Sequence, residues 1–216
     1  MNEKKILIGI ILATLIAVGV WMFFETRPRV GNKLEEAGRD HVPVGTQVEY
    51  KTNPPTSGPH FADPAKPGIY ERVIDDSNLV HSLEHGYVII SYNCAFKQAF
   101  LPALIRNVSA HGTEEEEEEN STSSAEIKYA MEDASASAQI GPDFLSDECH
   151  TLVDNLIAIY EAKGKRKMII VPRPALDAKI ALTAWNYIDK FNEFDKGRIE
   201  KFIDSNLDKG PEKTME

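Results

Sequence analysis

The hydrophobic pattern begins with one long stretch without a charged side chain, residues 6–24, which is 19 residues long. As a helix it would span roughly 28 Å, close to the hydrocarbon thickness of a bilayer. Lys4 and Lys5 precede it, and Trp21 lies near its far end, where an indole suits the membrane interface. The pattern predicts a single-pass transmembrane anchor over residues 1–24, with a cytoplasmic N-terminus. A cleaved signal peptide is the alternative, although its apolar core is usually only about 7–15 residues long.

Beyond this stretch the pattern changes to that of a folded domain. Residues 25–40 are polar and charged, and are expected to form a spacer. Residues 41–67 are rich in proline and glycine, which favours extended and turn-rich backbone over helix. A short helix is predicted over residues 80–85, ended by Gly86. The composition of residues 87–92 then predicts a strand.

The middle of the chain loses its apolar pattern. A helix is expected over residues 95–106, and a flexible insertion over residues 107–142. The insertion includes six consecutive glutamates at 114–119, which repel one another and cannot build a core. It also carries two glycosylation-type sequons, which begin at Asn107 and Asn120.

Regular periodicity returns in the last third of the chain. A helix is predicted over residues 146–163, with a serine as a good N-cap at its start. Apolar strands are predicted over residues 167–171 and 179–185, and a last helix is expected after Asp195. This order of elements predicts an α+β domain over residues 41–212, with a small mixed sheet and packed helices.

Composition narrows the range of functions. The chain has 216 residues and 42% hydrophobic content, which is enough to build the core of one domain. Its formal net charge is −10 at pH 7, and no cluster of lysine or arginine interrupts this acidity. Phosphate backbones are bound by such clusters, so the composition argues against nucleic acid as a partner.

The chain has two cysteines, Cys94 and Cys149. They do not form a redox Cys-x-x-Cys motif, and an even number of cysteines in an exported domain predicts a disulfide. On the chain-entropy model, closing this loop stabilises the fold by about 4 kcal/mol. Two buried free thiols are the alternative.

Four of the six histidines lie in the first half of the domain: His41, His60, His81 and His85. His81 and His85 are four residues apart, so on a helix they share a face and both imidazoles can reach one metal ion. Glu84, beside them, can accept a proton, bind the metal or face water. The alternative for the histidine pair is a surface position near a helix end, where it interacts with the helix dipole.

His60 closes the proline- and glycine-rich block at residues 53–60. Proline fixes φ and glycine permits close approach, so this loop can hold His60 rigidly against the helix. The pattern therefore predicts that His60, His81 and His85 converge on one site, and three imidazoles suit copper or zinc. In the alternative interpretation the loop is structural and His60 caps a turn.

The spacing His81-x-x-Glu84-His85 is also the inverted zinc-peptidase pattern, in which the glutamate is the base for a metal-bound water. It occurs as well in the cytosolic enzyme that cleaves S-ribosylhomocysteine, where a distant cysteine completes the metal site. Glu148 and Cys149 lie downstream here. A metal-dependent hydrolase or lyase with Glu84 as base is therefore an alternative function.

Three sequence blocks resemble the DUF3105 family, an uncharacterised bacterial and archaeal family. They are Asn-Pro-Pro-Thr-Ser-Gly-Pro-His at 53–60, Leu-Val-His-Ser-Leu-Glu-His-Gly at 79–86 and Ile-Ala-Leu-Thr-Ala-Trp at 180–185. The Gly-Pro-Glu block at 210–212 is also similar to the C-terminal half of that family. The resemblance covers about residues 40–212 without the acidic insertion.

The resemblance implies no activity, because the family's function is unknown. It marks the following residues as members of the signature motifs: His60, His81, Glu84, His85 and, in addition, His41. This chain departs from the family at Asn186, where a glycine usually follows the tryptophan, and in its long acidic insertion.

The sequence leads to one hypothesis and two alternatives. The hypothesis is a membrane-anchored extracytoplasmic domain that binds a transition metal through its histidines, with copper ahead of zinc. The first alternative is the metal-dependent hydrolase or lyase. The second is a metal-free binding or assembly module, in which the histidine motifs only brace the fold.

Overall fold

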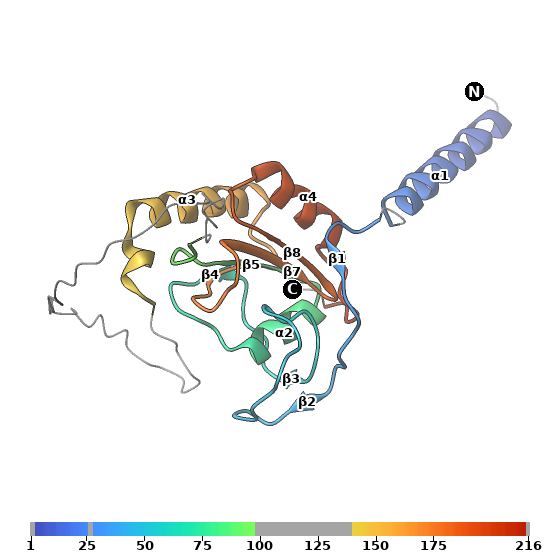
Figure 1. Ribbon diagram of the computed structural model, residues 1–216. Helices are drawn as coiled ribbons and strands as arrows, with labels where there is room; N and C mark the ends of the chain where they lie inside the picture. Colours follow the sequence, from blue (N-terminus) through green and yellow to red (C-terminus); the bar gives the residue numbers. More distant parts are fainter. Residues whose placement is uncertain (1–2, 26–27, 98–139, 215–216) are drawn as a thin grey trace, which may run out of the picture.

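The computed structural model describes residues 3–25, 28–97 and 140–214 (Figure 1). The chain begins with helix α1, Glu3–Glu25, which projects away from the rest of the protein in Figure 1. Within the described ranges, no helix combines the length and the apolar character that crossing a bilayer requires. The expected helix is thus present, but the structure does not support the transmembrane anchor expected over residues 1–24.

A mixed sheet is the centre of the domain. In the described residues it has six strands in the order β1-β8-β7-β5-β6-β4. Strand β5 pairs in parallel with β6 and antiparallel with β7, so the predicted mixed α+β architecture is confirmed. The strands are β1 Asn32–Lys33, β4 Gly68–Ile69, β5 Val88–Tyr92, β6 Met168–Pro172, β7 Ile180–Ala184 and β8 Tyr187–Phe191.

Helices cover both faces of this sheet. They are α2 Asp76–Glu84, α3 Asp147–Ala162 and α4 Lys196–Asn206, and a short 3-10 helix, η1 Pro142–Leu145, precedes α3. Side chains alternate along a strand, and in β5 Ile90 packs with the apolar cluster of α3 and α4, whereas Ile89 packs with that of α2. All residues of β5, β6 and β7 are buried, because a sheet covered on both faces needs apolar side chains at every position.

One helix boundary and two strands differ from the sequence-based expectation. The expected spacer contributes β1, which pairs with β8, so this part of residues 25–40 packs on the domain. Helix α2 begins at Asp76 instead of residue 80, because Asp75 caps it by accepting a hydrogen bond from the backbone N of Ser77 at 2.8 Å. Strand β8 was not predicted, since its polar Asp189 and Lys190 interrupt the apolar pattern.

The tight turn before β8 explains the departure from the family at Asn186. This residue has φ 61°, in the left-handed region that glycine normally occupies and that asparagine adopts more readily than most residues. The asparagine therefore preserves the turn between β7 and β8.

The disulfide between Cys94 and Cys149 is confirmed, with a Cα–Cα distance of 5.5 Å. It joins the chain after β5 to the first turn of α3, which Ser146 caps as predicted. Residues 95–97 are not helical. The rest of the helix expected over 95–106, and the acidic insertion expected over 107–142 up to residue 139, lie outside the described residues.

A second, small sheet lies beside α2. It pairs β2, His41–Val42, in parallel with β3, His60–Phe61. Figure 1 shows these two strands at the edge of the domain, next to α2 and away from α3. The proline- and glycine-rich region between residues 41 and 67 is otherwise irregular, as its composition predicts.

Candidate metal centre

The small sheet brings the first two histidines together. His41 and His60 are register partners in the β2–β3 pair, so their side chains leave neighbouring strands at the same level. Their ring centroids are 5.0 Å apart. His60 is fully buried, whereas His41 is exposed at the rim.

The loop before His60 is fastened at several points. Tyr50 donates a hydrogen bond from its hydroxyl to Pro59 O at 2.8 Å and contacts Ser77 Oγ at 3.2 Å in the first turn of α2. Gly58 has φ 134°, and a Cβ there would lie 3.0 Å from the Tyr50 ring. The loop therefore needs glycine at this position to pack against Tyr50, and this packing positions His60 against α2.

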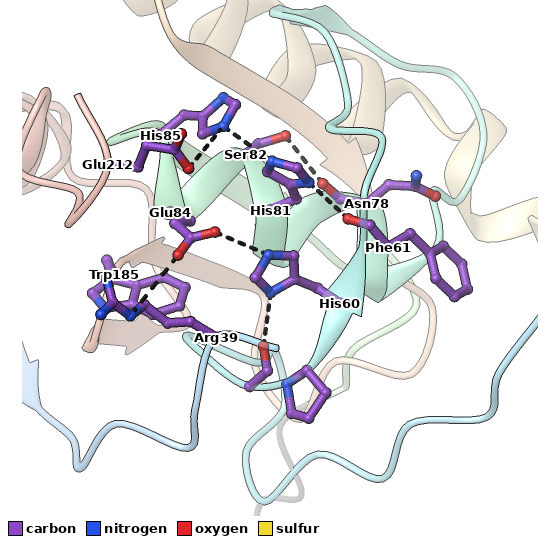
Figure 2. Close-up of polar contacts among 12 residues, drawn as sticks. Arg39, His60, Phe61, Asn78, His81, Ser82, Glu84, His85, Trp185 and Glu212 are labelled. Carbon is purple, nitrogen blue, oxygen red and sulfur yellow. Dashed lines mark hydrogen bonds and ion pairs between the residues drawn. The ribbon is translucent and has the colours of Figure 1, made fainter. Parts of the chain in front are cut away.

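Helix α2 supplies the other half of the cluster. His81 and His85 lie one turn apart on its inner face, and their Nε2 atoms are 3.0 Å apart. Figure 2 shows the Glu84 carboxylate between His60 and Arg39. The side chains of His81, Glu84 and His85 are buried, which is unusual for charged and imidazole groups without a specific partner.

Backbone carbonyls fix the orientation of two rings. Nδ1 of His60 lies 2.8 Å from Gly58 O, and Nδ1 of His81 lies 2.7 Å from Phe61 O. A carbonyl only accepts, so each Nδ1 carries the hydrogen, and in a neutral ring the lone pair is then on Nε2. Metal-binding histidines are held in this way in many proteins, with the second nitrogen bonded to a carbonyl or carboxylate.

The carboxylate of Glu84 faces one of these lone pairs. Its Oε2 lies 3.0 Å from Nε2 of His60, and its Oε1 lies 4.0 Å from Nε of Arg39. A carboxylate oxygen and a neutral imidazole nitrogen with no hydrogen repel each other at this distance. A proton shared between them, or a metal ion bound by both, removes the repulsion.

Burial favours the neutral form of His81, which is the form of imidazole that can bind a metal ion. Desolvation is the main cause that lowers the pKa of His81, and the hydrogen bond with Phe61 O acts in the opposite direction. The neighbouring His85, His60 and His41 lower the pKa further. The neutral imidazole is therefore favoured near pH 7.

The described residues hold two groups whose ligand atoms lie within 4.8 Å of one another. The first is His41, His60, His81 and Glu84, and the second is His81, His85 and Glu212. All four histidines singled out from the sequence are thus brought together, with Glu84 among them. The expected single site of His60, His81 and His85 is instead divided between two groups that share His81, because His85 lies at the end of α2 and faces Glu212.

Glu212 and Arg39 were not identified from the sequence as site residues. Glu212 reaches the cluster because the C-terminal segment lies against the end of α2: its backbone N donates to Glu84 O at 3.1 Å. A Cβ on Gly210 would overlap Glu84 O and Gly86 N, so only glycine permits this approach. The one available signal was the Gly-Pro-Glu block at 210–212, which belongs to the resemblance described above.

The comparison with the enzyme that cleaves S-ribosylhomocysteine loses its support. Cys149 is in the disulfide, so it cannot complete a metal site with the histidine pair as the comparison with the S-ribosylhomocysteine-cleaving enzyme requires. Glu148 is exposed and pairs with Lys179, and it belongs to neither ligand group.

Comparison with known proteins agrees with the sequence blocks. A family model described as "Protein of unknown function (DUF3105)" matches residues 41–126 and 146–216. These ranges include every member of both ligand groups. No curated protein and no solved structure matches the chain.

Proposed function

The chain belongs to the DUF3105 family, whose function is unknown, and we propose that its domain binds one divalent transition-metal ion, zinc or copper. The ligands are His41, His60, His81 and Glu84, which we call the inner set. The observation that carries this proposal is the fixed orientation of His60 and His81, whose Nδ1 atoms are held by Gly58 O and Phe61 O.

The chemistry of the inner set supports an ion of this class. Three imidazole nitrogens and one carboxylate oxygen suit tetrahedral Zn²⁺ and also Cu²⁺. The set contains no sulfur ligand, which favours these ions over Cu⁺. A divalent cation also offsets the cost of burying the Glu84 carboxylate against a neutral imidazole.

The contacts of Glu84 favour a ligand over a catalytic base. As the base of a hydrolase or lyase, Glu84 would direct its carboxylate at a metal-bound water. Its Oε2 instead lies 3.0 Å from His60, and its carboxylate belongs to the inner set. We therefore favour metal binding without assigning a reaction.

An extracytoplasmic location is part of the proposal. The disulfide between Cys94 and Cys149 supports it, because disulfides persist in oxidising compartments. The uncharged stretch at residues 6–24 favours attachment to the membrane through α1. A reporter fused to the C-terminus tests the location of the domain: activity confined to the cytoplasm contradicts it.

Metal content is the direct test of the proposed function. The full-length protein, purified without a histidine tag from medium that contains zinc and copper, is expected to hold about one ion per chain by elemental analysis. Glu84→Gln and His60→Gln should lose most of this ion, whereas His150→Gln, an exposed histidine on α3, should retain it. Far-UV circular dichroism checks that the variants fold. A wild-type protein that stays metal-free in this medium and on titration contradicts the proposal.

A further inference from the structure

His81 belongs to both ligand groups, and its chemistry allows it to serve only one ion at a time. Nδ1 carries the hydrogen that bonds Phe61 O at 2.7 Å. Only Nε2 then has a lone pair, and one nitrogen lone pair forms one metal bond. An ion bound with His60 and an ion bound with His85 therefore compete for the same atom.

The second group, His81, His85 and Glu212, is here called the outer set. Nε2 of His85 lies 3.0 Å from Nε2 of His81 and 3.6 Å from Oε2 of Glu212, and Figure 2 shows the three side chains in a row at the end of α2. The side chain of Glu212 is 53% exposed, whereas that of His85 is 10% exposed. The outer set thus extends from the buried cluster to solvent.

Glu212 is placed there by specific contacts of the C-terminal segment. Asp208 N donates to Gly86 O at 2.8 Å, and Glu212 N donates to Glu84 O at 3.1 Å. The buried amine of Lys167 lies 3.1 Å from Asp208 Oδ1 and 2.7 Å from Thr214 O. These contacts hold the segment on both sides of Glu212, so its position beside His85 follows from the fold.

We infer that one metal ion uses two alternative positions that share Nε2 of His81. The inner set holds the ion at equilibrium, because it offers four ligands that include the buried His60 and Glu84. The outer set, with three ligands and an exposed carboxylate, exchanges the ion with solvent. The ion moves between them by exchanging His41, His60 and Glu84 for His85 and Glu212 while it stays on His81.

This inference rests on the proposed function and can be tested separately from it. The full-length protein is titrated with Zn²⁺ in a calorimeter, and release of Zn²⁺ to excess chelator is followed in time. Wild type should bind one ion. Glu212→Gln should bind one ion with affinity within about 3-fold of wild type, but its binding and release should both be about 10-fold slower. Glu193→Gln, an exposed glutamate before α4, is the matched control and should change nothing.

Variants of the inner set give the complementary result. Glu84→Gln should still bind one ion, more weakly and with faster release, through the outer set. His81→Gln should abolish binding by both sets.

Each result supports or overturns a defined part of the inference. Two ions bound tightly by wild type would show that the positions are simultaneous and not alternative. Unchanged rates in Glu212→Gln, with one ion in wild type, would overturn the outer position and leave the proposed function intact. No binding by wild type would overturn both.

Discussion

Two regions of this domain bury polar side chains, and they satisfy them in different ways. On the face of the sheet covered by α4, Asn206 is fully buried and donates to Val30 O and Phe202 O, both at 2.9 Å, while its Oδ1 accepts from Arg29 at 2.8 Å. On the face covered by α2, Glu84 Oε2 faces the Nε2 of His60 that has no hydrogen in the neutral ring.

The difference distinguishes a structural polar group from a pair that we propose binds a metal ion. Every donor and acceptor of Asn206 has a complementary partner, which is the normal condition for buried polar groups. The pair of Glu84 and His60 becomes complementary only when a proton or a metal ion joins the two atoms. Proteins accept such local costs where a site must bind a ligand, so the α2 face is expected to trade stability for binding.

Loss of the disulfide should have the largest effect on stability. Replacing both Cys94 and Cys149 with serine should lower the free energy of unfolding by about 2–4 kcal/mol, because the unfolded chain regains the entropy that the crosslink removes. Urea denaturation at pH 7 measures this change. The disulfide lies on the α3 side, so Zn²⁺ affinity of the folded variant should stay within about 3-fold of wild type. A much larger loss of affinity would show that the two faces are not independent.

Removal of the structural polar group should have the next largest effect. Asn206→Ala leaves the Arg29 side chain without one buried acceptor and should cost about 1–3 kcal/mol in urea denaturation. Asp204→Ala, an exposed position on the same helix, removes only a surface ion pair with Lys163 and should cost less than about 1 kcal/mol. If the two variants are equally stable, Asn206 does not have the structural role assigned to it.

Replacing the buried Glu84 on the α2 face should instead increase the stability of the metal-free protein. In Glu84→Gln, the amide can donate a hydrogen bond to Nε2 of His60, so the metal-free protein should gain about 1 kcal/mol of stability. Zn²⁺ affinity should fall by at least about 10-fold, because a ligand is lost. Denaturation in the presence of chelator, together with calorimetric titration, measures both effects. If metal-free Glu84→Gln is less stable than metal-free wild type, the idea that Glu84 lowers stability in order to bind metal is wrong.

The sequence predicted the local parts of this arrangement and not the long-range ones. The spacing of His81 and His85 sets their common face on a helix. The caps and apolar periodicity located both ends of α3 within a residue and the start of α4 after Asp195. These features depend on neighbours in the chain. The contact of Glu212 with His85 depends on the C-terminal segment crossing the end of α2, over a separation that local pattern does not encode. The division of the histidines into two sets follows from that contact.

A similar limit explains the missed strands. Strand β1 is two residues long and polar, and it becomes a strand only because β8 offers an open edge. The proline- and glycine-rich loop was interpreted as a support for His60, and its packing against Tyr50 could not be predicted from local composition.

The smallest expected effect is a pH dependence of the metal-free protein. Burial lowers the pKa of His81 in the folded state below the unfolded value of about 6.5. The unfolded state therefore binds more protons between the folded and unfolded pKa values, and stability falls as pH decreases through about 6.5 toward the lower folded value. Above about pH 7.5 both states are neutral at this residue, and its contribution no longer changes.

Urea denaturation in the presence of chelator, at pH 7.5 and pH 5.5, measures this dependence. His81→Gln cannot titrate and should show a smaller loss of stability at pH 5.5 than wild type does. His150→Gln, which changes an exposed histidine on α3, should keep the wild-type dependence. If wild type and His81→Gln lose the same stability at pH 5.5, the pH dependence arises from another titratable group. Burial of the His81 imidazole would then not lower the stability of the fold. Only the pair of Glu84 and His60 would then distinguish the α2 face from the site of Asn206.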